Sequence, residues 1–451
     1  MGAVKNPWVD RFKAFDTLEK IRARVNCRPS PLVGLERELP GVAEVFVEKA
    51  LESIYFASVQ ELQILKYLLE RASVHCRVTY PGVREYIERL YAGRNLHEHT
   101  FQKPTCLLGT AGVGKSQLMK AFGRLMPNDG VIDVDKNHAN MPLHGSWLVT
   151  ANSSQSVIRT LRPHVGEAMR GVVRASVAEC LQTSSDVAFR NGVSYLVIDE
   201  TQFIVGSDAT VTITKMLMNV AELGIPVLFV ANFSLWRALE RRHEQIKQRL
   251  LTNPQLLSPE APGSVDWLGY LRECALVLGD SIVIDVLIDG DVVYDMTAGI
   301  KRFVVLLLKT AYRIAWEAGQ HVVTSRHVEQ AYGSSAYAVA RRQVSVMLDP
   351  LSEARTAAAY SCPIEMPLDQ VAAMKQYRAQ RSQKAIAEAT RVSAMTVAER
   401  KEEKDCSLPN REKIIVEKRP KRSKRTVEEL VVNGLQAQEA GGIYARNKRR
   451  F

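Results

Sequence analysis

A glycine-rich run at residues 109–116 carries the strongest chemical signal in the sequence. It reads Gly109-Thr110-Ala111-Gly112-Val113-Gly114-Lys115-Ser116 and fits the pattern G-x-x-x-x-G-K-[ST] at every position. Glycines let backbone N–H groups turn inward around a β-phosphate, and the N-terminus of the following helix adds its positive dipole end. We expect Lys115 to neutralise β- and γ-phosphate oxygens of ATP and the Ser116 hydroxyl to bind Mg²⁺. Gln117 comes next and is expected at the same site.

A pair of adjacent carboxylates closes the apolar run Tyr195-Leu196-Val197-Ile198-Asp199-Glu200. Asp199, at the end of the predicted strand, is the expected second Mg²⁺ ligand, and Glu200 is the expected general base that polarises the attacking water. An acidic cap on a strand end is the alternative interpretation. A simple nucleotide kinase or GTPase lacks such a pair of carboxylates. The Asp-Glu pair therefore favours hydrolysis of ATP over phosphoryl transfer to a small substrate.

Two further positions could act on the γ-phosphate. Asn232 follows the predicted strand at residues 227–231 and could hold the attacking water, although the Asn-Phe-Ser sequence also suits a plain turn. Arg249 ends a basic stretch just before Pro254. In a ring or filament it could reach a neighbour's γ-phosphate, and such a finger can supply roughly 10³–10⁵ in rate. Arg241 and Arg242 are alternatives, and an exposed basic helix face explains the same residues.

A second domain could contribute one more cation. The run Thr297-Ala298-Gly299-Ile300-Lys301-Arg302-Phe303 opens a long apolar helix. A helix that starts here could place Arg302 over the nucleotide, and Lys301 is a plausible substitute. The alternative is an ordinary helix start that faces solvent.

Apolar runs and helical patterns alternate around these motifs. Strands are predicted at residues 105–108, 147–150, 195–198 and 227–231, and helices at 115–125, 302–318 and 325–332. The strand at 147–150 lies between the two nucleotide motifs along the chain. This alternation predicts an α/β fold, a three-layer core with a parallel sheet followed by a helical lid. Residues 1–34, with three prolines, are expected to form an irregular arm, and residues 36–90 are expected to be helical.

Composition bounds the class of protein. The chain has 451 residues, of which 46% are apolar and 24% charged, so it can bury a sizeable core. No apolar run is long enough to cross a membrane, residues 1–10 lack the basic and apolar pattern expected of a secretory signal, and the seven cysteines form no Cys-x-x-Cys pair. We expect a cytoplasmic protein. The expected domains are a helical extension at residues 1–100, a nucleotide-binding core at 101–255, a lid at 256–345 and a basic tail at 346–451.

The basic charge is concentrated at the C-terminus. Residues 371–451 hold 20 Lys and Arg against 10 Asp and Glu, while the net charge of the whole chain is +11. The clusters at 418–425 and 446–450 could bind a polyanion such as DNA, or an acidic protein partner. Residues 383–398 have the spacing of a helix-turn-helix, with Arg391 at the turn, but a charged exposed helix explains them equally.

Taken together, these motifs resemble those of the AAA+ ATPases, and within them the transposon-encoded TnsC/TniB class of transposition regulators. The resemblance covers roughly residues 100–345 and rests on residues 109–116, the string at 197–202, the strand leading to Asn232, the helix ending near Arg249 and the lid-like segment at 297–332. It implies a bacterial protein that assembles as an ATP-bound homo-oligomer, a ring or helical filament, on double-stranded DNA. It also implies two protein partners, because such regulators connect a target-site selector to a transposase.

Two other functions fit the same residues. A replication initiator or helicase loader would use the same ATP site but would contact an origin or a helicase. A nucleotide-gated signalling switch would need no DNA, and the Asp-Glu pair speaks mildly against it because a switch does not require efficient hydrolysis.

Overall fold

The computed structural model describes residues 6–92, 101–127, 129–150, 157–169, 176–199, 207–283, 286–349, 360–396 and 399. The chain divides into two compact units, Met1–Arg381 and Ser382–Phe451. The sheet, the lid and the candidate site all belong to the first unit. Of the second unit the structure describes mainly the end of α18 (Leu368–Ala394), a helix that begins in the first.

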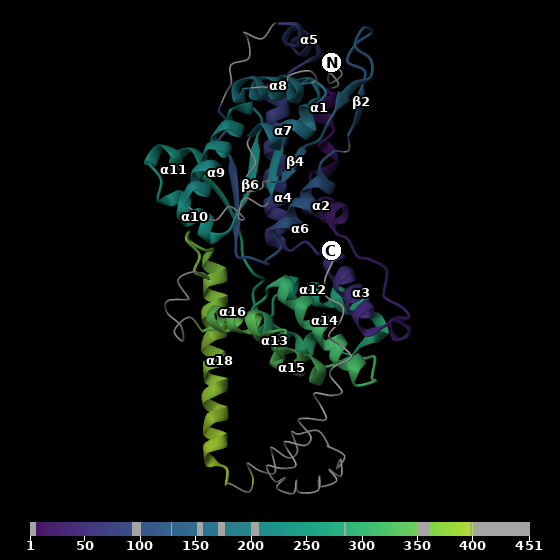
Figure 1. The fold of residues 1–451 in the computed structure, drawn as a ribbon, viewed down its shortest axis with the longest axis vertical. Helices are drawn as coiled ribbons and strands as arrows, with labels where there is room; N and C mark the ends of the chain where they lie inside the picture. The colour runs from purple at the N-terminus through teal and green to yellow at the C-terminus, as the bar shows by residue number, and fades with distance from the viewer. Residues whose placement is uncertain are drawn as a thin grey trace, which may run out of the picture. The chain divides into compact units, whose positions relative to one another are not determined.

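A five-stranded sheet lies at the centre of the first unit (Figure 1). Its order is β4 (Trp147–Thr150), β5 (Leu196–Asp199), β6 (Val227–Ala231), β1 (Thr105–Gly109) and β7 (Asn253–Leu257). Every neighbouring pair is parallel, with Thr105 of β1 opposite Leu228 on one side and Asn253 on the other. All five strands therefore end at the same edge, where parallel α/β sheets place their ligands.

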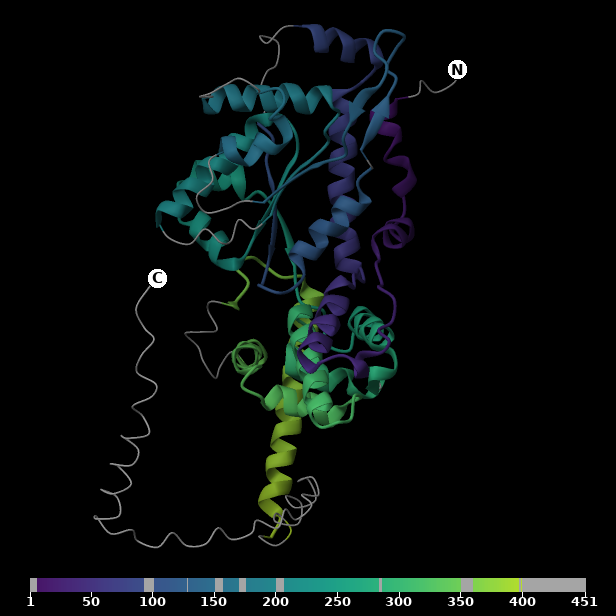
Figure 2. The ribbon, with the colours of Figure 1, turned by 45° about the vertical axis from the view of Figure 1, so that its right-hand side comes forward.

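Side chains from the two faces of the inner strands pack into two separate hydrophobic cores. Leu107, Val197 and Leu228 pack against the N-terminal helices α1 (Pro7–Asp10), α2 (Leu18–Val25), α4 (Val59–Thr79) and α6 (Lys115–Leu125). Cys106, Ile198 and Phe229 pack against α7 (Val157–Val165), α8 (Val177–Arg190), α9 (Ser207–Val220), α10 (Phe233–Glu240) and α11 (Glu244–Leu250). Figure 2 shows these two sets of helices on opposite sides of the sheet. Burial on both faces explains why the strands read as continuous apolar runs.

A helical lid with its own core follows β7. It consists of α12 (Val265–Leu278), α13 (Val286–Thr297), α14 (Lys301–Glu317), α15 (Ser325–Gly333) and α16 (Ala338–Leu348), with the short strands β8 (Ile282–Val283) and β9 (Val323–Thr324). The N-terminal helix α3 (Pro40–Ser53) packs against α14 and shares this core. The predicted fold class, a parallel-sheet core followed by a helical lid, is confirmed.

Smaller elements decorate the sheet. A hairpin of β2 (Gly130–Ile132) and β3 (Met141–Leu143) follows α6, and α5 (Val83–Tyr91) follows α4 after the predicted break at Pro81-Gly82. Single 3-10 turns lie at Lys13–Phe15, Leu35–Arg37, Ala221–Leu223 and Gly279–Ser281. None of the helices in the described ranges combines the length and hydrophobicity that a membrane crossing needs.

The four predicted strands are present as β1, β4, β5 and β6, and one strand was missed. The strand predicted at 147–150 is β4, which forms one edge of the sheet, and β6 lies between β1 and β5. The strand β7 was not predicted at all, because Pro254 looked like the point where the helical lid begins. Proline is tolerated in β7 because that strand is also an edge and leaves one side of its backbone unpaired.

Within the described residues, part of the predicted irregular arm is helical. Residues 18–25 form the helix α2, and Trp8 of α1 is 1% exposed in the same core as the sheet. The Trp8 ring lies 5.3 Å from the ring of Tyr80 and 4.7 Å from that of Tyr86. The first helices therefore share the core of the central sheet.

In the described part of residues 383–398 the structure supports a charged exposed helix and not a helix-turn-helix. α18 runs without interruption from Leu368 to Ala394, so Arg391 lies inside a helix and not in a turn. Its exposed side chains fit the charged surface helix that was the alternative. The basic clusters at 418–425 and 446–450 lie outside the described residues.

Truncating Trp8 tests whether the N-terminal helices belong to the core. We expect Trp8→Ala to lower the free energy of unfolding by about 3–5 kcal/mol, the usual cost of removing a buried large aromatic side chain. Chemical denaturation followed by circular dichroism measures this. Val33→Ala, at a position 91% exposed, is the matched control and should change stability by less than about 0.5 kcal/mol. Equal stability of the two variants would show that α1 is dispensable to the core.

Candidate nucleotide-binding site

The loop after β1 has the backbone of a phosphate cradle. Gly112 and Gly114 have φ angles of +84° and +117°, a region that only glycine enters at low cost. Val113 between them is 3% exposed and anchors the loop in the core. No side chain caps the N-terminus of α6, which begins at Lys115. Its first N–H groups are thus oriented as an anion site at the positive end of the helix dipole.

The side chain of Lys115, the first residue of α6, folds back into this loop. Its Nζ donates to the carbonyl oxygens of Gly109 at 2.8 Å and Thr110 at 2.7 Å, and the residue is 6% exposed. The pKa of Lys115 is lowered to about 8, mainly by burial and also by the positive charge of Arg302, while the Asp199 carboxylate opposes both effects. These interactions show that Lys115, Asp199 and Arg302, predicted from three separate motifs, lie in one neighbourhood.

Asp199 ends β5 and is half-buried, opposite Thr150 of β4. Its carboxylate and the Ser116 hydroxyl are hard oxygen ligands of the kind Mg²⁺ prefers, and Mg²⁺ usually completes its shell with water and phosphate oxygens. The described ranges contain no group of three His, Cys, Asp or Glu side chains able to hold a metal by itself. The residues therefore fit a Mg²⁺ ion that is bound together with a nucleotide. Glu200 lies outside the described residues, so its role as general base stays a prediction.

Asn232 lies at the end of β6 and caps α10. Its Oδ1 accepts the backbone N–H of Leu235 at 2.9 Å and the hydroxyl of Ser234 at 2.8 Å. Asn232 thus caps a helix, where the alternative prediction was a plain turn, and the cap uses only the side-chain oxygen. The Nδ2 group, with two hydrogens to donate, is the part that could address a water or a phosphate at this edge of the sheet.

Arg302 is one of the lid residues that pack on the phosphate loop. Its backbone N–H donates to the Gly112 carbonyl at 3.3 Å. A Cβ added to Gly112 would lie 3.1 Å from the Cβ of Arg302 and 3.2 Å from Cγ2 of Ile300. The first turn of α14 therefore rests directly on the loop, as expected for a lid arginine over the nucleotide.

Lys301 has a different environment, although it is the neighbouring residue. Its ammonium pairs with Glu61 at 2.9 Å and with Glu260 at 3.8 Å. Both carboxylates are buried, so this cation is already engaged. The structure thus separates the two cations, with Lys301 paired to carboxylates and Arg302 packed on Gly112.

Arg249 lies near the amino ends of the strands, at the end of the sheet opposite the phosphate loop. It is exposed near the end of α11, and its guanidinium stands 5.0 Å from the ring centre of Phe101. Phe101 precedes β1 and Arg249 precedes β7, so both lie at the amino ends of strands whose carboxyl ends carry the phosphate loop. Arg249 cannot join the Lys115 neighbourhood of its own chain, and its predicted role in a neighbour's site stays a prediction. Gln117, which was also predicted at the site, donates a hydrogen bond from its side-chain amide to the Glu52 carbonyl oxygen at 2.9 Å.

Residues 360–381, assigned by sequence to the basic tail, form a strap across the core and the lid. Arg237 of α10 donates to the Ser361 hydroxyl at 3.1 Å, and Arg381 pairs with Asp295 of α13 at 2.9 Å. The strap walls a cavity of about 680 Å³ that also borders Thr110 of the phosphate loop. Met374 and Tyr377 pack on the lid core at helical spacing and Val371 lines the cavity, a pattern that the sequence analysis missed.

A side chain at Gly112 should disturb the contact between loop and lid. Gly112→Ala is expected to weaken ATP binding roughly tenfold, because alanine at a positive φ costs about 1–2 kcal/mol and its methyl group would press on Arg302 and Ile300. Titration with a fluorescent ATP analogue measures the affinity. Gly123→Ala in α6 has nothing within 4 Å of the new methyl group and should bind ATP as the unmodified chain does. If Gly112→Ala also binds normally, α14 does not rest on the loop in solution.

Comparison with known proteins gives similarities of fold only. No protein-family model matches the chain, and no curated protein matches it. Among solved structures, the ADP form of the Aeropyrum pernix ORC2 protein is 15% identical with a TM-score of 0.39, over 59% of this chain and 67% of that one. The Aeropyrum pernix ORC1 protein in complex with DNA is 18% identical with a TM-score of 0.33, over 62% and 68%. Domain III of the replication initiation protein DnaA from Thermotoga maritima is 14% identical with a TM-score of 0.32, over 55% and 88%.

The two archaeal chains are thus matched over about two thirds of their length. Similarities this weak assign no function to the present chain. The proposal below rests on its own site.

Proposed function

We propose that this protein is an AAA+-type ATPase that binds double-stranded DNA as an ATP-dependent homo-oligomer and regulates DNA transposition. The observation that carries the ATPase part is the meeting of Lys115, Asp199 and Arg302 around the uncapped N-terminus of α6. Three motifs from distant parts of the chain supply a phosphate-binding ammonium, a Mg²⁺ ligand and a lid cation at one edge of the sheet. That set of groups suits a nucleoside triphosphate with its metal.

In the proposed mechanism each residue acts on the γ-phosphate or on the attacking water. Lys115 exchanges its two backbone carbonyl partners for phosphate oxygens, and Arg302 approaches from the lid. Glu200 removes a proton from the water as Asn232 holds it in line, and Arg249 of a neighbouring subunit stabilises the transferred charge. Mg²⁺, held by Ser116 and Asp199, would neutralise charge on the β- and γ-phosphates. Loss of the γ-phosphate would then release the contacts made by Arg302 and Arg249.

The transposition role rests on the resemblance to the TnsC/TniB regulators described above. It assigns two protein partners, a transposase and a target-site selector. A replication initiator or helicase loader is the alternative that shares the same ATP-dependent DNA binding. The genes beside this one separate the two roles, since a transposase gene and terminal inverted repeats support transposition and a replication operon supports initiation.

ATP turnover of the purified protein tests the enzymatic part. Phosphate release should be measured with and without duplex DNA of random sequence, for the unmodified chain and for Lys115→Ala. We expect DNA to raise turnover and Lys115→Ala to abolish it, because the variant lacks the ammonium that binds the β- and γ-phosphates. Equal phosphate release by both proteins would overturn the proposal, and ATP binding without turnover would favour the signalling switch.

A further inference from the structure

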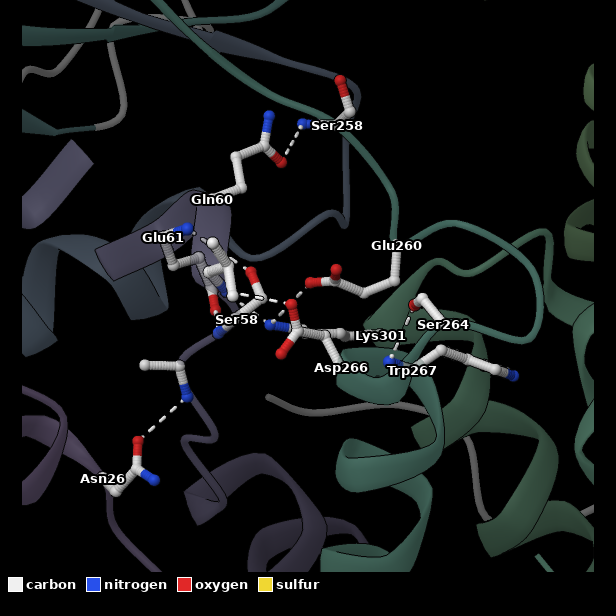
Figure 3. Close-up of polar contacts among 12 residues, drawn as sticks. Asn26, Ser58, Gln60, Glu61, Ser258, Glu260, Ser264, Asp266, Trp267 and Lys301 are labelled. Carbon is white, nitrogen blue, oxygen red and sulfur yellow. Dashed lines mark hydrogen bonds and ion pairs between the residues drawn. The ribbon is translucent and has the colours of Figure 1, made fainter. Parts of the chain in front are cut away.

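A buried polar network joins three distant segments beside the phosphate loop (Figure 3). The capping residues Ser58–Glu61 at the start of α4, the stretch at 256–266 after β7, and Lys301 at the start of α14 meet there. Glu61 accepts the backbone N–H of Ser58 at 2.9 Å with one carboxylate oxygen and pairs with Lys301 at 2.9 Å through the other. The network thus ties an N-terminal helix to the first turn of the lid helix that carries Arg302.

The stretch after β7 is fastened to the same helix. Gln60 donates to the Leu256 carbonyl at 2.9 Å and accepts the N–H of Ser258 at 3.2 Å. Asp266 of α12 accepts the N–H of Val59 at 2.9 Å. The start of α4 is therefore bonded to both ends of the connection between core and lid, which is where a lid that responds to nucleotide must bend.

Lys301 and its two carboxylate partners have little access to water, which strengthens their ion pairs. Its side chain is 17% exposed, that of Glu61 is 1% exposed, and that of Glu260 is 10% exposed. The ammonium also lies 5.6 Å from the ring centre of Tyr270, within the range of a cation–π contact. In such surroundings the loss of one carboxylate would leave a buried charge without compensation, so Lys301 would have to find another anion.

The phosphates of a nucleotide bound in the loop would lie close to Lys301. A Cβ added to Gly114 would lie 3.7 Å from Cδ of Lys301 and 3.8 Å from Oε1 of Glu61. Arg302, one residue further on, packs on Gly112 of the same loop. Successive helix residues point about 100° apart, so the first turn of α14 places Lys301 against Gly114 and Arg302 against Gly112.

We propose that Glu61 and Glu260 are positioning residues that hold Lys301 away from the phosphates and thereby keep Arg302 over them. The proposal rests on the ATPase function proposed above and gives the N-terminal helices a part in it. The two carboxylates decide which of two adjacent cations meets the nucleotide. Removing them would let Lys301 compete with Arg302 for the γ-phosphate.

Glu260 makes the network sensitive to pH near neutrality. The pKa of Glu260 is raised to about 7, mainly by burial and also by the Glu61 and Asp266 charges, whereas Lys301 and the Ser58 hydroxyl oppose the rise. The ionisable groups that face Glu260 come from α14, α4, α12, α13 and the segment between α3 and α4, namely Lys301, Glu61, Asp266, Tyr294 and Tyr55. Below pH 7 Glu260 becomes neutral, and Lys301 keeps the Glu61 and Asp266 carboxylates.

The test compares kcat and KM for ATP in Glu61→Gln with those in Glu48→Gln. Glutamine at position 61 can still complete the capping box at the start of α4, so the helix should be retained. Glu48 pairs with Lys309 of α14 at 2.6 Å, an ion pair between the same helix and an N-terminal one but away from the loop. We expect Glu61→Gln to lower kcat/KM by tenfold to a hundredfold, the usual size of a misplacement of about 1 Å, and Glu48→Gln to leave it unchanged. Equal effects of the two variants would overturn the proposal.

Two further measurements separate positioning from mere stability. In an Arg302→Ala background, Glu61→Gln should cause no additional loss, because its effect acts through Arg302. Glu61→Gln combined with Lys301→Met removes the competing cation and should recover most of the lost kcat/KM. A double variant as poor as Glu61→Gln alone would contradict the proposal.

The pH profile gives a readout that a structural role would not change. Relative to Glu260→Gln, the unmodified chain should gain kcat/KM as pH rises through about 7, because the ionised Glu260 strengthens the hold on Lys301. A constant ratio between the two proteins from pH 6 to 8 would count against Glu260. If the unmodified chain neither binds nor hydrolyses ATP, it is the proposed function that fails, and that outcome is visible before any variant is made.

Discussion

Arg249→Ala is expected to lower ATP turnover of the DNA-assembled protein by roughly 10³–10⁵-fold while leaving ATP binding by the isolated chain unchanged. The reason is positional. Arg249 lies at the amino-end edge of the sheet beside Phe101, whereas the phosphate loop lies at the carboxyl-end edge. Within one subunit it cannot touch the nucleotide, so any effect on turnover must act on a neighbour.

Mixing two inactive variants tests this directly. Arg249→Ala has an intact site but no arginine to offer, and Glu200→Gln can offer Arg249 but has no base. Mixed oligomers should therefore regain part of the turnover that each variant lacks alone. Arg241→Ala and Arg242→Ala, at the turn between α10 and α11, are the controls and should stay active. No recovery in the mixture, or loss of activity in a control instead, would move the finger elsewhere.

Glu200→Gln is expected to bind ATP with unchanged affinity and to hydrolyse it about 10²–10⁴-fold more slowly, because the amide cannot accept the proton of the attacking water. Asp199 remains to bind Mg²⁺, so the bound state is preserved. The variant should consequently stay on DNA after ATP is added. Single-turnover phosphate release and dissociation from a labelled duplex measure the two effects. Glu222→Gln, an exposed carboxylate after α9, is the matched control, and unchanged turnover in Glu200→Gln would refute the general-base role.

Local patterns predicted much of the core because the elements that hold the phosphates are also locally encoded. The helix predicted at 115–125 is α6 with the same bounds, since it begins directly after Gly114 and ends before Pro127. The strands before the motifs could be read because both of their faces are buried. The strand β7 was not predicted because it contains Pro254 and is held by its pairing with β1, a long-range contact that no local pattern reveals.

The choice between Lys301 and Arg302 could not be made from sequence for the same kind of reason. Both cations open α14, and nothing local distinguishes them. The distinction depends on Glu61, which is 240 residues away along the chain and reaches Lys301 only after α4 packs beside the loop. Likewise the strap at 360–381 reads as part of a basic tail until its apolar side chains meet the lid.

Binding to a labelled duplex of random sequence, with a non-hydrolysable ATP analogue, with ADP and without nucleotide, tests the central claim most directly. Lys115→Ala is the matched variant, because its lost ammonium should remove the nucleotide response and nothing in the basic tail. The account predicts tight, cooperative binding only with the ATP analogue, and none of it in the variant. Binding that is the same in all three nucleotide states, or the same in Lys115→Ala, would contradict an ATP-gated assembly and leave DNA affinity to the basic residues at 418–425 and 446–450 alone.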